Sequence, residues 1–379
     1  MAKVLLGPYS KSGSGITTYL LELCKVLVDT GMEVTLFGFE PNSDLSCIKK
    51  RIEWISVGRD VGSWIAFFPL QIYLINKTNN KLKALFKDVD IVHYVSPSLS
   101  VGIKHPNFVL TAWSILTSFS RHASSVMRFY KFPLSILSPI TLWQATLINS
   151  LSYKNARRII CVTEKLSELL SKKYGMERVV YIPPAINVYP NIKREDSEEV
   201  SIFFVSRDIS LPRKNFNTFW KALVRLDKLY YTRRIKVHII GYIKSSILER
   251  IKFIKNLTIM AHGFLDRRQI TNLYNSASRP IYVSTSIYEE FNYSLLEALS
   301  KGAVAVVSDI PAHRDHVVDY QTGFLCNPYD DFAIFTRIRK LIDDIELYNR
   351  LKTMSSEYIL KKFDWKVVLP KILKVYSDS

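Results

Sequence analysis

The stretch Ile287-Tyr-Glu-Glu-Phe-Asn-Tyr-Ser-Leu-Leu-Glu-Ala-Leu-Ser-Lys-Gly302 is the most informative segment of this 379-residue sequence. Its leucines and alanines recur at helical spacing, and Gly302 predicts the end of the helix. Ser294 is the expected N-cap, because its hydroxyl can accept a backbone N–H of the first turn. Two acids eight positions apart, Glu289 and Glu297, frame the start of this predicted helix.

The two acids have a structural and a functional interpretation. A carboxylate near a helix start gains only about 0.3–1 kcal/mol from the helix dipole, so Glu289 could simply cap the helix. Glu297 stands inside the helix between apolar residues, where a carboxylate on a solvated face is less expected. Ribose hydroxyls are natural hydrogen-bond donors to a carboxylate in that position. Glu289 would then face sugar hydroxyls, and the backbone N–H groups of Asn292, Tyr293 and Ser294 would meet phosphate. The segment therefore indicates a nucleotide-sugar site.

The length and composition predict two folded domains. Hydrophobic residues make up 48% of the chain, and the four cysteines are scattered, so neither a disulfide framework nor a metal site is expected. The longest apolar runs, Trp64–Ile75 and Pro133–Ile148, contain proline and are too short to span a membrane. The first residues predict a strand and a turn rather than a signal peptide, so we expect a cytoplasmic protein.

Strands and helices alternate in two successive halves. The first half predicts strands at 4–8, 33–37, 90–94, 108–111, 158–162 and 179–182, with helices at 16–29 and 164–173. After a polar linker at 191–199, the second half predicts strands at 200–205, 236–240, 257–260, 280–284 and 304–307, with helices at 217–229, 267–275 and 331–342. This pattern predicts an α/β fold of two Rossmann-like domains facing each other across a cleft where ligands bind. The expected boundaries are 1–184 for the first domain, 185–355 for the second, and 356–379 for a C-terminal helix that returns to the first.

Two loops have the composition of phosphate-binding segments. The turn that contains Gly13 and Gly15 opens the first helix, so it is either a ligand loop or an ordinary turn. Arg207, at a strand end, is followed by Arg213 and Lys214 before the next helix. Two or three cations there form either a pyrophosphate clamp or a solvated basic loop.

The net charge of +18 suits an anionic partner. Residues 91–163 contain no Asp or Glu, and the bases within that stretch alternate with aromatic residues. In Met127–Trp143, Arg128 and Lys131 stand beside aromatic and aliphatic side chains, as in a segment that lies on a membrane surface. The alternative is that these aromatic residues belong to the core or line an acceptor pocket.

Glu289 and Glu297, with Phe291 between them, resemble the signature of the retaining glycosyltransferases of family 4, which have the GT-B fold. The resemblance runs nearly end to end. Its further segments are Ser206-Arg207 with Lys214, Asp90–His93, Val162–Glu164, Ser308-Asp309, Thr322–Leu325, Phe363–Trp365 and the Gly13–Gly15 turn.

The resemblance implies the role of each candidate residue. Arg207 and Lys214 would stabilise the departing diphosphate without a metal or other cofactor, Glu289 would hold the transferred sugar, and Glu297 the ribose. The donor would be a UDP- or GDP-linked sugar, and the acceptor a lipid-linked, glycan or protein hydroxyl. The remaining donor contacts would come from Gly13, Gly15, Gly263, Phe264, Phe291, Asn292, Tyr293 and Ser294. On the acceptor side the candidates are His93 and Trp113, although a lone histidine at a strand end is more often structural.

The sequence departs from the family pattern in three places. Glu290 and Asn292 stand where the family usually has glycines that leave room for the sugar. Trp113 replaces a histidine that would contact the donor sugar, and Ser206 replaces a glycine before Arg207.

Other functions therefore stay open. A GT-B protein acting as a catalytically weak scaffold or binding partner is one, and a GT-B epimerase or phosphorylase is another. A nucleic-acid-binding module is a third, although the bases spread over both halves and match no nucleic-acid-binding motif, so no nucleic-acid partner is expected. The expected location is the cytoplasm, with peripheral attachment to the inner face of the cell membrane.

Overall fold

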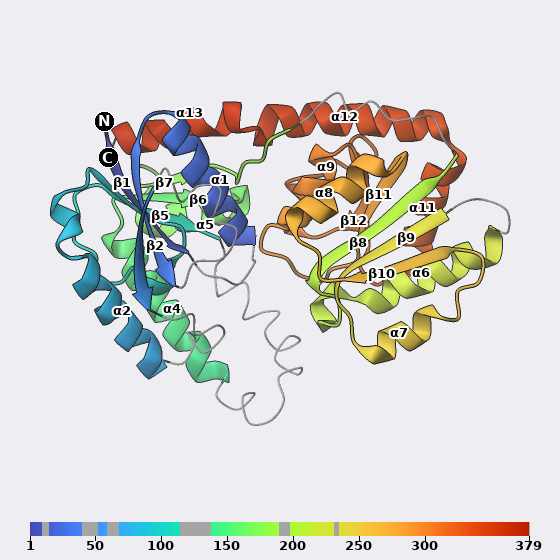
Figure 1. The fold of residues 1–379 in the computed structure, drawn as a ribbon, viewed down its shortest axis with the longest axis horizontal. Helices are drawn as coiled ribbons and strands as arrows, with labels where there is room; N and C mark the ends of the chain where they lie inside the picture. Colours follow the sequence, from blue (N-terminus) through green and yellow to red (C-terminus); the bar gives the residue numbers. More distant parts are fainter. Residues whose placement is uncertain are drawn as a thin grey trace. The chain divides into compact units, whose positions relative to one another are not determined.

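The computed structural model describes residues 1–9, 15–39, 52–58, 68–113, 138–188, 198–230 and 235–378. The chain forms two compact units (Figure 1). Unit 1 comprises Met1–Ala185 and Trp365–Ser379, and unit 2 comprises Ile186–Asp364. The chain returns to unit 1 at Trp365 rather than at residue 356, because helix α12 (Ile345–Phe363) continues unbroken through Phe363.

Unit 1 is a parallel sheet with helices on both faces. Its strands are ordered β3-β2-β1-β4-β5-β6-β7, and every neighbouring pair is parallel. The strands are β1 (Lys3–Tyr9), β2 (Glu33–Phe39), β3 (Glu53–Gly58), β4 (Ile91–Tyr94), β5 (Phe108–Ala112), β6 (Arg158–Cys161) and β7 (Val179–Tyr181). The helical segments are α1 (Gly15–Asp29), α2 (Phe68–Leu82), η3 (Leu85–Lys87), η4 (Pro97–Leu99), α4 (Ser138–Asn155), α5 (Glu164–Tyr174) and α13 (Trp365–Ser377).

Apolar strands place the core of unit 1 on both faces of its sheet. Val4, Leu5 and Leu6 of β1 are all fully buried, as is typical of a central parallel strand. Leu5 packs in the cluster that contains side chains of α2, α4 and α5. On the opposite face Tyr19 of α1 stacks on Trp365 of α13, with ring centroids 6.1 Å apart. The C-terminal helix is therefore part of the core of unit 1.

Unit 2 repeats this architecture. Its parallel sheet is ordered β10-β9-β8-β11-β12-β13. The strands are β8 (Val200–Asp208), β9 (Ile235–Tyr242), β10 (Thr258–Gly263), β11 (Arg279–Ser284), β12 (Val304–Ser308) and β13 (Gly323–Cys326). Besides α12, the helical segments are η5 (Pro212–Lys214), α6 (Phe216–Leu229), α7 (Ser245–Ile251), α8 (Arg267–Ser276), α9 (Tyr293–Ser300), α10 (Pro311–Arg314) and α11 (Asp331–Asp343).

The two parallel sheets confirm the predicted α/β fold class, and each strand and helix expected from the sequence is present. In unit 2, side chains of α6, α7, α11 and α12 share one core cluster with the strands. Because all its strands run the same way, the loops that follow β8, β10 and β11 emerge at one edge of the sheet. These loops and helix α9 together carry most of the predicted donor-binding residues.

Asp227 near the end of α6 fixes the entry to β10. Its buried carboxylate accepts backbone N–H groups from Lys255 at 3.1 Å, Asn256 at 2.6 Å and Leu257 at 3.1 Å. The anchor therefore fixes the start of the strand whose other end, at Gly263, leads into a predicted donor contact.

Replacing Asp227 with alanine is predicted to lower the free energy of unfolding by about 2–4 kcal/mol, since three backbone donors lose a charged acceptor. The measurement is urea denaturation. The control is Glu249→Ala, which removes an exposed ion pair with Lys252 and is predicted to change stability by less than about 0.5 kcal/mol. Equal losses of stability in the two variants would contradict the anchoring role of Asp227.

Candidate functional site

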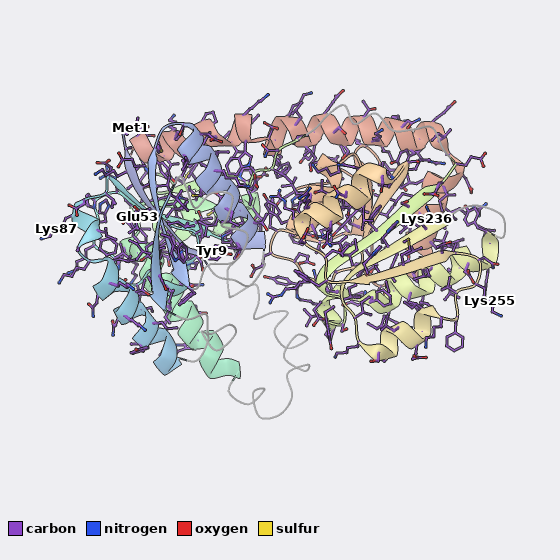
Figure 2. All side chains as sticks on the ribbon, in the orientation of Figure 1. Met1, Tyr9, Glu53, Lys87, Lys236 and Lys255 are labelled. Carbon is purple, nitrogen blue, oxygen red and sulfur yellow. The ribbon has the colours of Figure 1, made fainter. Side chains whose placement is uncertain are left out.

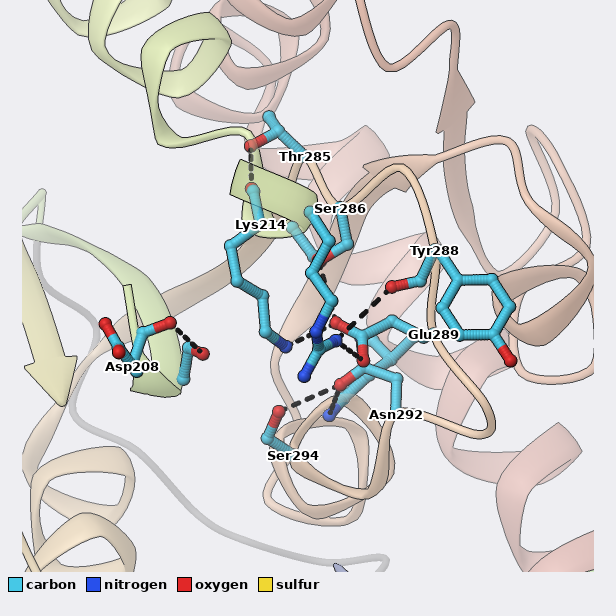
Figure 3. A network of polar contacts seen from close by, with 12 residues as sticks. Asp208, Lys214, Thr285, Ser286, Tyr288, Glu289, Asn292 and Ser294 are labelled. Carbon is cyan, nitrogen blue, oxygen red and sulfur yellow. Dashed lines mark hydrogen bonds and ion pairs between the residues drawn. The ribbon is translucent and has the colours of Figure 1, made fainter. Parts of the chain in front are cut away.

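Glu289 lies between two cations at the carboxyl edge of the unit 2 sheet (Figure 3). Its Oε2 accepts a hydrogen bond from Arg213 Nη1 at 2.9 Å, and its Oε1 is bonded by Lys214 Nζ. Ser286 adds a third donor, with its Oγ 2.8 Å from Oε1. The structure therefore brings together one predicted catalytic carboxylate and one predicted phosphate-binding lysine.

The backbone ties the two loops of this site together. The peptide N–H of Ile287 donates to Arg213 O at 2.8 Å. Thr285 Oγ1 donates to the carbonyl oxygens of Lys214 at 3.1 Å and of Asn215 at 2.9 Å. The loop after β11 and the turn η5 thus hold their side chains in register before any ligand arrives.

Burial strengthens the electrostatic interactions among these charged side chains. The side chains of Glu289 and Lys214 are 9% and 11% exposed, whereas that of Arg213 is 32% exposed. Burial alone would raise the pKa of Glu289, but Lys214 and Arg213 outweigh it and lower the pKa to about 2. Burial lowers the pKa of Lys214, and the Glu289 carboxylate opposes that shift. Two cations against one carboxylate leave one positive charge for an incoming anion.

Asn292, and not Ser294, caps helix α9, so the predicted N-cap is wrong. Asn292 has a left-handed backbone with φ of 65°, and its Oδ1 accepts the N–H of Leu295 at 3.3 Å. Ser294 lies inside the helix and donates to Asn292 Oδ1 at 2.9 Å. Asparagine tolerates left-handed conformations better than most residues, which explains how it can replace the usual glycine.

The Asn292 side chain points into the protein and not into a sugar pocket. Asn292 is 8% exposed, and its Nδ2 donates to Nε2 of His313 at 2.8 Å. His313 in turn donates from Nδ1 to Ser308 O at 2.7 Å. Burial lowers the pKa of His313 to about 4, so the ring is neutral near pH 7. The larger residue is therefore accommodated inside unit 2.

Arg207 lies at the carboxyl end of β8, which pairs directly with the strand that precedes Glu289. Its side chain is exposed, and within the described part of the chain it forms no hydrogen bond or ion pair. The fold therefore places a solvent-facing guanidinium at the same sheet edge as Lys214.

Glu297 is held by Arg267 at the first turn of α8, with Arg267 Nε 2.8 Å from Glu297 Oε1. Its side chain is 20% exposed. The hydroxyl of Tyr282 bonds Ser294 Oγ at 3.0 Å. Burial raises the pKa of Tyr282, and the charges of Glu289 and Glu297 raise it further. Glu297 is therefore a partly buried carboxylate that is paired with Arg267.

The other predicted donor contacts divide into buried and exposed residues. Phe291 and Tyr293 are 3% and 7% exposed, and Phe291 packs edge-on against His316 with ring centroids 4.4 Å apart. These two rings are core residues, so any donor contact at these positions would come from the backbone. By contrast, Phe264 is 70% exposed, and the left-handed Gly263 before it has open space where a side chain would start.

The glycine turn in unit 1 is only partly described. Gly15 is the first residue of α1. Gly13 lies outside the described residues, as do Arg128 and Lys131 of the predicted membrane segment.

The two acceptor-side candidates are buried in unit 1. His93 is 0% exposed, and its ring nitrogens bond Tyr376 Oη at 2.7 Å and Thr111 Oγ1 at 2.8 Å. Burial lowers the pKa of His93 to about 3. Trp113 is 6% exposed and donates to Val95 O at 2.7 Å. These contacts give both residues structural roles and do not support the acceptor-side prediction.

Three polar residues of the site were missed from the sequence. They are Ser286, Tyr282 and His313, which bond Glu289, Ser294 and Asn292 respectively. Ser286, two residues beyond β11, could have been suspected from its place at the carboxyl edge. His313 could not, because its contact depends on how the loop after β12 folds back.

Two family models match successive parts of the chain. Residues 13–189 match the Glycosyltransferase Family 4 model, and residues 186–357 match Glycosyl transferases group 1. The chain therefore belongs to the group 1, family 4 glycosyltransferases. The family assignment confirms the resemblance found in the sequence.

Curated relatives of the same class match parts of the chain. A glycogen synthase of Mycobacterium tuberculosis is 29% identical over 114 residues, which are 30% of this chain and 27% of the relative. A phosphatidyl-myo-inositol mannosyltransferase of Mycobacterium leprae is 30% identical over 101 residues, or 26% of this chain and 27% of the relative. The matched part is thus about a quarter of the length of each relative.

Solved structures resemble the fold over its full length. Sucrose-phosphate synthase from Thermosynechococcus elongatus has a TM-score of 0.73 at 16% identity, covering 100% of this chain and 99% of the other. HepE from Anabaena, solved with UDP and glucose, has a TM-score of 0.68 at 15% identity and full coverage of both chains. At these identities the likeness shows a shared GT-B fold.

Two features are absent from the described residues. No helix among them is both long and apolar enough to cross a membrane. Within the same ranges, no three His, Cys, Asp or Glu side chains are grouped so that they could hold a metal ion.

The capping role of Asn292 gives a stability prediction. Asn292→Ala loses the cap and the bond to His313, and alanine tolerates a left-handed backbone less well than asparagine does, so the free energy of unfolding should fall by about 2–3 kcal/mol. Asn292→Gly keeps the backbone conformation and should cost about half as much or less. Chemical denaturation of both variants checks this order, and a glycine variant less stable than the alanine variant would contradict it.

Proposed function

We propose that this chain is a retaining glycosyltransferase that moves a sugar from a nucleotide-sugar to an acceptor hydroxyl without a metal ion. One observation carries the proposal: a buried carboxylate, Glu289, is held by Lys214 and Arg213 at the sheet edge where Arg207 stands exposed. Cations fixed at that edge supply the stabilisation that a departing diphosphate needs.

Each side chain then has a role in transfer. Lys214 and Arg207 bind the diphosphate, and their charge stabilises the negative charge that grows on the leaving oxygen. Helix α9 begins at Tyr293, and the positive end of its dipole favours an anion near this residue. Glu289 faces the sugar, and Glu297 accepts hydrogen bonds from the ribose.

The donor is a UDP- or GDP-linked sugar. HepE, which shares the fold, was solved with UDP and glucose, and this supports UDP-glucose as the first donor to test. A thermal-shift panel of UDP-, GDP- and ADP-sugars, followed by donor hydrolysis and transfer assays, tests the function. Absence of both binding and turnover across that panel would favour the scaffold alternative.

Arg207→Ala and Lys214→Ala are each predicted to lower kcat/KM by tenfold to a hundredfold or more while the protein stays folded. Each substitution removes a charge-assisted contact with the diphosphate, worth about 1.5–3 kcal/mol or more in the transition state. Steady-state kinetics with the donor identified by the panel measure the loss. Near-normal turnover by both variants would remove the proposed phosphate clamp.

A chelator provides the control for the proposed metal independence. Activity in EDTA should equal activity without it, because protein cations stabilise the leaving group. Loss of activity in EDTA that Mn²⁺ restores would contradict this mechanism.

We also propose that the enzyme attaches peripherally to an anionic membrane and uses a lipid-linked or otherwise membrane-borne acceptor. Helix α4 supports this with three exposed apolar side chains at i, i+4 and i+8, and therefore on one face: Trp143 at 64%, Leu147 at 38% and Leu151 at 39%. On α2 the ring of Tyr73 is 57% exposed and carries Lys77 Nζ 5.7 Å from its centroid. Apolar and basic side chains together suit the surface of an anionic bilayer.

The basic residues are not confined to this region. Figure 2 shows Lys87 on unit 1 and Lys255 on unit 2 pointing outward. Distributed charge of this kind gives long-range attraction to an anionic surface, whereas the apolar face of α4 would give the attachment its orientation.

Flotation with phosphatidylglycerol vesicles tests the attachment. We predict binding at low salt that decreases at high salt and falls further in Trp143→Ser with Leu147→Ser, or in Arg128→Glu with Lys131→Glu. The control is Leu169→Ser on α5, which changes an exposed leucine elsewhere and should bind as the wild type does. Absence of binding at low salt would leave the attachment without support.

A further inference from the structure

Arg213 makes more contacts with the segment that carries Glu289 than Lys214 does. Its Nη1 lies 2.9 Å from Glu289 Oε2 and 3.4 Å from Tyr288 O, and its own carbonyl accepts the N–H of Ile287 at 2.8 Å. Lys214 contacts the Glu289 carboxylate through its ammonium group, and its carbonyl oxygen accepts the Thr285 hydroxyl at 3.1 Å (Figure 3). The two cations therefore take different oxygens of one carboxylate and hold the loop unequally.

In the proposed function, the ammonium group of Lys214 interacts with two different anions. It bonds Glu289 Oε1 in the free protein, and in the proposed function it binds the donor diphosphate. A carboxylate that loses its lysine partner while buried needs another cation, because an unpaired buried charge is costly. Arg213 is the described cation that already bonds the other oxygen of Glu289.

We propose that Arg213 is a positioning residue that keeps Glu289 ionised and oriented toward the donor sugar when Lys214 exchanges from the carboxylate to the diphosphate. The inference rests on the proposed function of the site. A planar guanidinium suits this role, because it can bond the carboxylate and the adjacent Tyr288 carbonyl at the same time. It assigns to Arg213 a role distinct from that of Arg207, which has its guanidinium exposed for the donor.

The first test separates positioning from phosphate binding. Arg213→Gln should lower kcat for UDP-glucose hydrolysis or transfer by at least tenfold and change the Kd for UDP by less than about threefold. Lys214→Ala, in contrast, should weaken UDP binding itself. A loss of UDP affinity in Arg213→Gln as large as that in Lys214→Ala would overturn the inference and make Arg213 a phosphate ligand.

The pH profile provides a measurement that a merely structural role would not change. Without Arg213 the pKa of Glu289 rises toward its ordinary value, so the acid limb of kcat should move to higher pH. Arg213→Lys keeps a positive charge and should restore part of kcat and return the acid limb toward that of the wild type. Wild-type kcat and an unmoved acid limb in Arg213→Gln would overturn the inference.

A measurement on the free protein keeps the test independent of the donor. Since the pKa of Glu289 is lowered in the folded state, its stabilisation is complete above about pH 4.5 and is lost as pH falls toward 2. The drop in unfolding free energy from pH 5.5 to about 2.5 should be smaller in Arg213→Gln than in the wild type. That difference should vanish in a Glu289→Gln background, and equal drops in the wild type and Arg213→Gln would overturn the coupling.

Matched controls distinguish failure of the inference from failure of the proposed function. Arg225→Gln removes another partly exposed arginine of unit 2, paired with Asp331, and should change neither kcat nor the acid limb. If the wild type turns over no nucleotide-sugar, the proposed function fails, and the measurement on the free protein still decides the Arg213–Glu289 coupling. If the wild type is active and Arg213→Gln matches it, only the inference fails.

Discussion

The buried ion pair between Glu289 and Lys214 is the interaction on which the proposed donor site depends. Burial of a carboxylate is unfavourable by itself, and here two cations and the Ser286 hydroxyl make the ionised form stable. The same cations leave an excess positive charge at the sheet edge. A site built in this way is stable without a ligand and still attracts an anionic donor.

The parallel sheet places these groups where they can act. Strand β8 ends at Asp208, just beyond Arg207, and the adjacent β11 leads into the loop of Glu289. Two left-handed asparagines then shape the backbone: Asn215 precedes α6, and Asn292 precedes α9. Asn292 also binds His313, so the start of α9 is fixed by a side-chain contact in place of the flexibility that a glycine would bring.

The sequence predicted the fold well, because short apolar strands and amphipathic helices follow local patterns. It missed helix α4, whose exposed face carries Trp143, Leu147 and Leu151, because apolar residues on the outside remove the usual one-sided pattern. In the candidate site, the spacing of charged residues in the sequence correctly indicated that Glu289 and Lys214 matter, because the two side chains contact each other. The burial of Phe291 and His93 could not be predicted, since it depends on contacts with His316 and with helices α12 and α13.

A crystal structure of the protein with UDP tests the central claim most directly, because it shows whether the Glu289 cluster is the diphosphate site. The account predicts a phosphate oxygen within hydrogen-bond distance of Lys214 Nζ, with Arg207 turned toward the diphosphate and Arg213 still bonded to Glu289. A diphosphate bound away from these residues, or a Lys214 that stays on Glu289 with UDP in place, would contradict the account.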